Sequence, residues 1–374
     1  MKAPPRKMEP LAVKGALRHP KKLALLEALR GFAATYVFVG HVAIMRFRLV
    51  RGSSALLFQF GQEAVMLFFL ISGFVIYYSV RNKPLVSARE YFSRRTLRIY
   101  PILLLSFAFS RYLCGRSGNL VANLAMLQDF KFAKPGVWFD VYGGNSALWS
   151  LSYEWWFYCL FFLLFRFVDS TKQQVIVTSL AVSAGLVFSL VPNEPCLFLI
   201  YFPIWWAGVE LSKCYSAKIR PTLVNQKHSV IALASGFAYF GCWSLLDAKR
   251  HIGLSLGLHP VLEARHFLAA LVILLGACLL SASGRKRFFA VLRPLALVAP
   301  ISYAMYVFHI PLVIQAHYLD GILGQAAVLA YAAILLLAAF LAEIPFQKLI
   351  NMLAQPLLRQ EGPNVPASEV SVRP

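Results

Sequence analysis

The chain has 374 residues, of which 59% are hydrophobic and only 14% are charged, and its mean hydropathy is +0.63. Soluble domains average about 25% charged residues, so this composition excludes an ordinary soluble globule, a disordered chain and a collagen-like fibre. The formal net charge is +21, from 37 Lys and Arg against 16 Asp and Glu. Because roughly 20 apolar residues cross one bilayer, the sequence predicts an all-α integral membrane protein with about ten transmembrane helices.

The expected spans follow one another along the chain. They lie at about 23–45, 56–80, 97–113, 147–167, 174–191, 197–212, 228–246, 264–282, 295–317 and 324–345. Since no repeat or linker divides the chain, we expect a basic N-terminal segment (1–22), one membrane domain (23–348) and a polar tail (349–374). With the N-terminus in the cytoplasm, inner segments carry 26 Lys and Arg and outer segments carry 10. The positive-inside rule then predicts that both termini are cytoplasmic and that most of the net charge reflects topology rather than nucleic-acid binding.

The cysteines predict no metal site, because the six of them form no CxxC pair and no zinc-ligand spacing. Cys114 and Cys196 both fall near the outer face. A disulfide between these two cysteines stays open as an alternative to free thiols.

Three ionisable residues lie in the first apolar segment, where such groups are costly and usually face a cavity or a partner. Eleven residues separate Arg30 from His41, or three helical turns plus about 20°, so the two share one face about 16 Å apart. Glu27 lies one turn before Arg30 and can pair with it. Two interpretations remain: a structural ion pair with a packing histidine, or a row of functional groups.

Further polar residues divide into two layers by depth. The outer layer holds His41, Glu154 and His309, and the inner layer holds Arg30, Arg95 and Arg98. Clustered guanidiniums suit phosphate, although a positive-inside anchor also explains them. One model explains both layers: an anionic donor with a long flexible arm enters from the cytoplasm, its phosphates meet the arginines, and its reactive end reaches a histidine farther out.

Six segments resemble, in order, the motifs of the membrane acyltransferase 3 family, which includes O-antigen and nodulation-factor acetylases. They are LLEALRGFAATYVFVGH, with Glu27, Arg30 and His41; VMLFFLISGFVI, with Ser72; FSRRTLRIYP, with Arg95 and Arg98; SLSYEWWFY, with Glu154; ISYAMYVFHIP, with Ser302, Tyr303 and His309; and LAEIPF, with Glu343. The resemblance covers about residues 23–348. One departure is Glu27, where Asp is common in the family.

The resemblance implies a multi-pass O-acyltransferase of the bacterial cytoplasmic (inner) membrane. Such an enzyme moves an acyl group, with acetyl as the expected one, from cytoplasmic acyl-CoA to a hydroxyl of an extracytoplasmic or lipid-linked carbohydrate. Acyl-CoA would be the co-substrate, and a carbohydrate or glycolipid and membrane lipids would be the partners, with no metal and no nucleic acid.

The resemblance also assigns roles to residues. Arg30, Arg95 and Arg98 would bind the CoA phosphates, and His41 would be a general base or a transient acyl carrier. Glu154 is our candidate for orienting His41. The residues expected to contact the acceptor or to support these groups are Glu27, Ser72, Ser302, Tyr303 and His309.

Two other classes of protein share some of these features. A transporter or flippase for a polar lipid or sugar also needs charges inside the membrane, but it would more often show repeats or broken half-helices. A structural subunit of an envelope complex would have no need of His41, Arg30 and Glu154 together.

Overall fold

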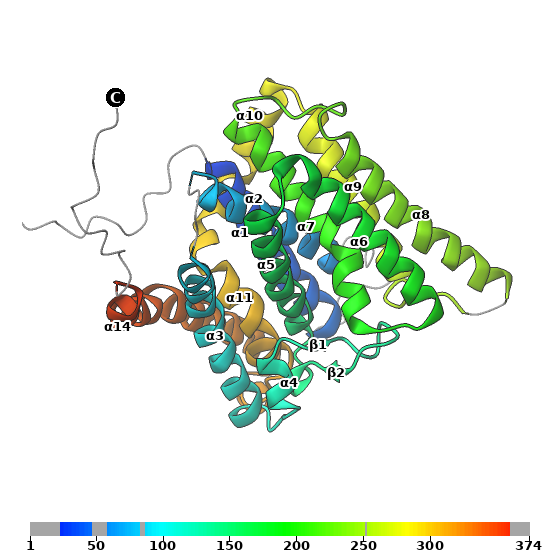
Figure 1. Ribbon diagram of the computed structural model, residues 1–374. Coiled ribbons are helices and arrows are strands. Elements are labelled where there is room, and N and C mark those ends of the chain that lie inside the picture. The colour runs from blue at the N-terminus through cyan, green and yellow to red at the C-terminus, as the bar shows by residue number, and fades with distance from the viewer. Residues whose placement is uncertain (1–22, 47–57, 83–86, 251–252, 360–374) are drawn as a thin grey trace, which may run out of the picture.

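The computed structural model describes residues 23–46, 58–82, 87–250 and 253–359, and this part of the chain is almost entirely helical (Figure 1). Eight of its helices are long and apolar enough to cross a membrane, or nine if the bent pair Ala282–Leu297 and Ala299–Ile314 counts as one span. These findings confirm an all-α membrane protein. All but the last residue of the remaining expected span, 97–113, lies within a longer helix, Ala88–Tyr112, which carries several arginines.

The long helices of the first half of the chain match the expected spans to within a few residues, apart from the early start of α3. They are α1 (Ala24–His41), α2 (Gly61–Val80), α3 (Ala88–Tyr112), α5 (Trp149–Phe167), α6 (Ser170–Leu190) and α7 (Glu194–Ser216).

The second half contains both long helices and short broken ones. The α-helices are α8 (Lys227–Lys249), α9 (Val261–Leu279), α10 (Ala282–Leu292), α11 (Ser302–His309), α12 (Asp320–Leu323), α13 (Ala327–Leu341) and α14 (Gln347–Arg359). Three short 3₁₀ turns join them: η6 (Arg293–Leu297), η7 (Ala299–Ile301) and η9 (Gly324–Ala326). Because α14 continues from α13 as far as Arg359, the expected tail is helical in its first part, while 1–22 and 360–374 lie outside the described residues.

The helices form two flanks around a central group (Figure 1). Helices α6, α8 and α9 lie on one flank and α3, α11 and α14 on the other, with α1, α2, α5 and α7 between them. Helix α7 is the most enclosed, since every residue from Ile200 to Val209 is buried. It packs against α2 through one glycine on each helix. A Cβ atom on Gly73 of α2 would lie 2.1 Å from Trp205 O of α7, and a Cβ atom on Gly208 of α7 would lie 2.0 Å from Leu70 O of α2. Without Cβ atoms, the two backbones can approach closely, as small residues allow in membrane bundles.

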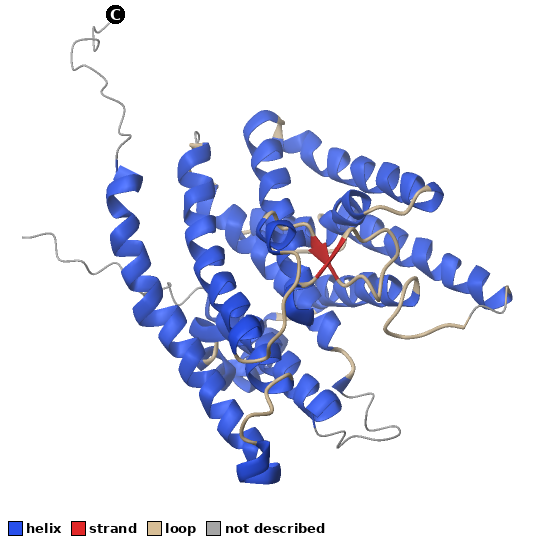
Figure 2. Ribbon diagram, turned by 90° about the horizontal axis from the view of Figure 1, so that it is seen from below, coloured by secondary structure: helices blue, strands red, loops and turns tan. Residues whose placement is uncertain are grey.

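One end of the bundle is covered by the segment between α3 and α5. This outer cap contains α4 (Leu120–Leu124), two short parallel strands, β1 (Gln128–Asp129) and β2 (Phe139–Asp140), and two 3₁₀ turns, η4 (Tyr142–Gly144) and η5 (Ser146–Leu148). Figure 2 shows the strands crossing over the helices, at the end opposite α10 in Figure 1. The Trp138 backbone N–H donates to Glu194 at 2.8 Å, which ties the cap to the start of α7.

Three helices pass into π-helical turns: η2 (Val42–Arg46) after α1, η8 (Ile310–Ile314) after α11, and η10 (Ala342–Phe346) after α13. Pro311 in η8 and Pro345 in η10 lack the backbone N–H that an α-helix needs, which accounts locally for two of these breaks. His41 and His309 are each the last α-helical residue before such a turn. π-Helical turns are frequent at functional sites.

All six cysteines are free thiols. The alternative of a Cys114–Cys196 disulfide is therefore wrong. The Sγ of Cys114 instead lies 3.2 Å from the Pro311 carbonyl oxygen, and Cys196 is buried at the start of α7.

Candidate active site

Two cavities follow one another along α1. The first, which we call the arginine cavity, has a volume of about 460 Å³ and takes in the first turns of α1. It contains eight of the expected site residues: Glu27, Arg30, Ser72, Arg95, Arg98, Glu154, Ser302 and Tyr303. The second, the histidine cavity, has a volume of about 450 Å³ and contains His41 and parts of the outer cap. Val65 and Tyr306 line both cavities and so form a shared wall.

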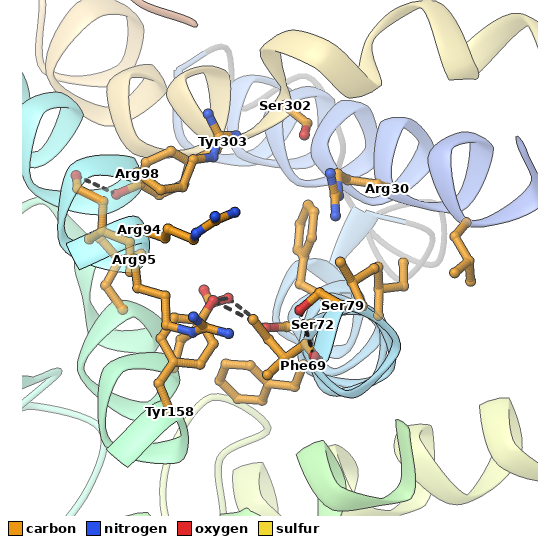
Figure 3. A pocket seen from close by; sticks show the side chains of 18 of the residues that line it. Arg30, Phe69, Ser72, Ser79, Arg94, Arg95, Arg98, Tyr158, Ser302 and Tyr303 are labelled. Atoms are coloured by element: carbon orange, nitrogen blue, oxygen red, sulfur yellow. Dashed lines mark hydrogen bonds between the residues drawn. The ribbon is translucent and has the colours of Figure 1, made fainter. Parts of the chain in front are cut away.

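Arginines reach into the first cavity from two sides (Figure 3). Arg30 projects from α1, and Arg94, Arg95 and Arg98 come from α3 on the opposite wall. Arg30 forms no hydrogen bond or ion pair with any residue in the described ranges, so the ion pair with Glu27 that the sequence left open is not formed. A guanidinium inside a membrane domain without a protein partner is available to an anionic ligand.

The arginines of α3 differ in how they are held. Arg95 is buried, donates to Tyr91 O at 2.6 Å and lies 3.3 Å from the centre of the Tyr91 ring, while its Nε has no partner among the described residues. Arg98 pairs with Glu343, whose side chain is 1% exposed. Glu343 also accepts from the backbone N–H of Ala304 at 3.0 Å. Arg98 thus has a carboxylate in direct contact, whereas Arg30 and Arg95 have none among the described residues.

Glu154 lies in the arginine cavity, where its carboxylate accepts hydrogen bonds from Ser72 Oγ at 2.7 Å and from the Tyr158 hydroxyl. This position corrects the expectation that Glu154 orients His41. Depth along a span does not fix the direction in which a helix faces, and α5 presents Glu154 to α2 instead. The close approach of α2 to α7 at Gly73 places the neighbouring Ser72 against this carboxylate.

His41 is oriented by His309. His309 Nδ1 lies 2.6 Å from Tyr306 O, and because a carbonyl only accepts, this contact places a proton on Nδ1. Nε2 of a neutral His309 is then an acceptor, and His41 Nδ1–H donates to it at 2.7 Å. His41 keeps a lone pair on Nε2. This nitrogen lies beside Gly61, 4.0 Å from the position that a Cβ atom on the glycine would occupy. The pair therefore presents a basic nitrogen to the histidine cavity.

The outer cap supplies most of the remaining polar lining of the histidine cavity. Lys134 Nζ and Asp129 form a buried ion pair at 3.0 Å, and the Tyr153 hydroxyl donates to the same carboxylate at 2.6 Å. Lys134 and Asp129 are thus already paired with each other, while Lys131 and Trp138 are exposed. Further polar lining comes from Gln62, Arg116, Ser146, Gln315 and His317.

Ser302 and Tyr303 make contacts that fix helices. Ser302 Oγ donates to Ala299 O at 2.8 Å, and the Tyr303 hydroxyl donates to Ile99 O at 3.1 Å beside Arg98.

The described residues contain no cluster of three or more His, Cys, Asp or Glu that could hold a metal ion. The site residues expected from the sequence did not include Arg94, Tyr158 and Tyr306, which also line the arginine cavity. The spacing of Tyr306 three residues before His309 was a signal that the two share one helix face.

The fold and the paired cavities define an integral membrane protein with a buried, two-part site. A family model described as "Acyltransferase domain" matches residues 23–345. The chain therefore belongs to this acyltransferase family, as the six motifs predict.

Two curated relatives carry acyltransferase names. Acyltransferase MdmB of Streptomyces mycarofaciens is 34% identical over 161 residues, which cover 39% of this chain and 40% of that protein. O-acetyltransferase OatA of Staphylococcus aureus (strain NCTC 8325 / PS 47) is 24% identical over 370 residues, or 88% of this chain and 56% of that protein. The chain thus spans about half the length of the curated relatives it matches. No solved structure matches it.

Proposed function

We propose that this protein is a membrane O-acyltransferase that moves an acyl group from cytoplasmic acyl-CoA to a hydroxyl of an extracytoplasmic or lipid-linked carbohydrate. The observation that carries the proposal is the pair of cavities with one shared wall, arginines in one and a basic histidine nitrogen in the other. Such a site suits a donor with an anionic end and a reactive end. Acetyl is the acyl group we expect, since one relative is named an O-acetyltransferase.

Coenzyme A would lie in the arginine cavity with its phosphates at Arg30 and Arg95. Both guanidiniums lack a carboxylate partner among the described residues, so they can form charge-assisted hydrogen bonds with phosphate without first breaking an ion pair. The pantetheine arm would then run along α1 toward the shared wall. The axial rise of about 16 Å from Arg30 to His41 is comparable to the length of that arm.

The acceptor would enter the histidine cavity beneath the outer cap. His41 Nε2 takes the proton from the acceptor hydroxyl as its oxygen bonds to the thioester carbon. The carbon–sulfur bond then breaks, and His41 returns the proton to the leaving thiolate. His309 would keep His41 in the tautomer that leaves Nε2 unprotonated.

The sidedness of this reaction follows from the charge distribution. Arg285, Lys286, Arg287 and Arg293 gather on α10 and η6, at the end of the bundle opposite the outer cap. From the positive-inside rule we expect that end to lie in the cytoplasm, as we expect for both termini. We infer that the arginine cavity opens toward the cytoplasm and the histidine cavity toward the outside of a bacterial inner membrane.

The first experiment is mass spectrometry of the envelope glycans of a strain that lacks the gene. The deletion strain is complemented with wild type, with His41→Ala, or with His228→Ala, which changes an exposed histidine of α8 as a control. We expect a glycan mass increment that the deletion removes and that wild type and His228→Ala restore, whereas His41→Ala does not. Restoration by His41→Ala would remove His41 from the mechanism, and glycans unchanged by the deletion would contradict the carbohydrate acceptor.

The donor is tested separately, with purified protein and acetyl-CoA. We expect acetyl-CoA to raise the melting temperature of wild type and to raise it less for Arg30→Ala. Arg111→Ala is the matched control, because Arg111 is an exposed arginine in the last turn of α3. No shift for wild type would contradict an acyl-CoA donor.

A further inference from the structure

The wall between the two cavities contains a phenol hydroxyl that the mechanism above does not use. Val65 and Tyr306 are the residues common to the two linings. Val65 has no polar side-chain atom, so the Tyr306 hydroxyl is the polar side-chain group that the shared wall offers. It lies 2.9 Å from Ser150 Oγ on α5, and the tyrosine is 7% exposed.

The Tyr306 hydroxyl can act as a donor to a ligand. In its hydrogen bond with Ser150 Oγ either oxygen can donate. When Ser150 is the donor, the Tyr306 proton is free to turn toward an oxygen atom bound at the wall.

On the proposed function, the reacting carbonyl must lie at this wall. Its carbon is bonded to a sulfur that arrives through the arginine cavity and is attacked by an oxygen that arrives through the histidine cavity. When the attacking oxygen bonds, the carbonyl oxygen gains a negative charge. Acyl transfer is fastest when a fixed donor stands about 3 Å from that oxygen.

We propose that the Tyr306 hydroxyl is the oxyanion donor of this acyl transfer, an inference that rests on the proposed function. As the acceptor oxygen bonds to the carbonyl carbon, its proton passes to His41 and the carbonyl electron pair moves onto the oxygen, which accepts from Tyr306. The electron pair then reforms the carbonyl, the carbon–sulfur bond breaks, and the proton on His41 passes to sulfur. Tyr306 keeps its own proton throughout.

Contacts with His309 and Phe68 hold Tyr306 in place. Its carbonyl oxygen accepts from His309 Nδ1 at 2.6 Å, so one residue fixes both the tautomer of the histidine pair and the position of the hydroxyl. The ring lies 5.7 Å from that of Phe68 and 6.0 Å from that of His309. A donor whose oxygen is held in this way needs only a rotation of its O–H bond to reach the carbonyl oxygen.

Two substitutions separate an oxyanion donor from a structural hydrogen bond. Tyr306→Phe and Ser150→Ala both abolish the same resting hydrogen bond, but only Tyr306→Phe removes the hydroxyl that would reach the carbonyl oxygen. The assay follows radiolabel from acetyl-CoA into the glycan and lipid fractions of membranes from the deletion strain, which supply the acceptor. The melting temperature of each purified variant reports on folding.

We expect Tyr306→Phe to lower kcat by about 10²- to 10³-fold, the usual loss on removing one oxyanion donor, with the KM for acetyl-CoA unchanged. Ser150→Ala should change kcat by about fivefold or less, because the loss of one neutral hydrogen bond is worth roughly 1 kcal/mol. Equal effects of the two substitutions, or a loss in KM alone, would assign Tyr306 a structural role and overturn the inference while leaving the proposed function intact. No transfer of label by wild type would instead overturn the proposed function, and this inference with it.

Discussion

His41 Nδ1 lies 2.7 Å from Nε2 of His309, although 268 positions separate the two residues in the chain. Each histidine ends an α-helix just before a π-helical turn, and η2 packs against η8. The two irregular turns therefore bring two imidazoles together at one depth. Within the pair only one nitrogen, His41 Nε2, is left as a base.

This relationship predicts different losses for the two histidines. His41→Ala should abolish measurable transfer, since it removes the base. His309→Ala should lower kcat by about 10²-fold and leave the KM for acetyl-CoA unchanged, because general-base catalysis is worth about 10²- to 10⁴-fold and depends on the right tautomer. The assay is label transfer from acetyl-CoA, with His228→Ala as control. Full activity of His309→Ala would show that the hydrogen bond between the histidines does not matter for the reaction.

Arg30 should matter for donor affinity but not for folding. Its guanidinium has no protein partner in the described part of the chain, so Arg30→Ala leaves no carboxylate unpaired. We expect the KM for acetyl-CoA to rise by about 10- to 100-fold, which corresponds to the loss of charge-assisted hydrogen bonds, with no fall in melting temperature. Arg111→Ala is the control. A variant that melts early with an unchanged KM would assign Arg30 a structural role.

Arg98 should behave in the opposite way, because its partner Glu343 is buried. Arg98→Leu leaves that carboxylate without its ion pair and should destabilise the protein by about 1–3 kcal/mol, the usual cost of a buried acceptor that loses its partner. Adding Glu343→Leu should restore much of the stability, since it removes the buried carboxylate that was left without a partner. Thermal unfolding of the single and double variants in the same detergent measures the difference. A double variant no more stable than Arg98→Leu would contradict this account.

The α2–α7 crossing should not tolerate a side chain at either of its two glycines, Gly73 and Gly208. Gly208→Ala places a Cβ where Leu70 O lies only 2.0 Å away, so the helices must separate, at a cost of about 1–3 kcal/mol. Because this crossing positions Ser72, we also expect lower activity. Gly241→Ala is the matched control, because no atom lies within 4 Å of the position of its Cβ and alanine favours helix. Equal melting temperatures for the two variants would show that α2 and α7 can separate freely.

The sequence separates the arginines from the two histidines by depth, but it groups Glu154 with the histidines although it lies in the arginine cavity, and it does not predict the direction in which each helix faces. Charged residues are so rare in apolar spans that Arg30, His41 and Glu154 stand out, and helical rise alone separates the arginine layer from His41. The partner of His41 could not be deduced in the same way, because the rotation of α5 and α11 about their axes depends on packing across the whole bundle. The spacing of Tyr306 from His309 places both on one helix face, but its role could not be predicted, since an aromatic residue in an apolar helix resembles core until the wall between the cavities is known.

The shared wall also has an electrical consequence. Two cavities that meet at Val65 and Tyr306 thin the insulating layer of the membrane to the side chains that line both of them. On the proposed topology, most of the membrane voltage falls across that layer, and moving one elementary charge through it involves about 2.3 kcal/mol per 100 mV. The proton that His41 passes from the acceptor to the thiolate moves within this field. The membrane potential of the cell would then directly change the rate of the reaction.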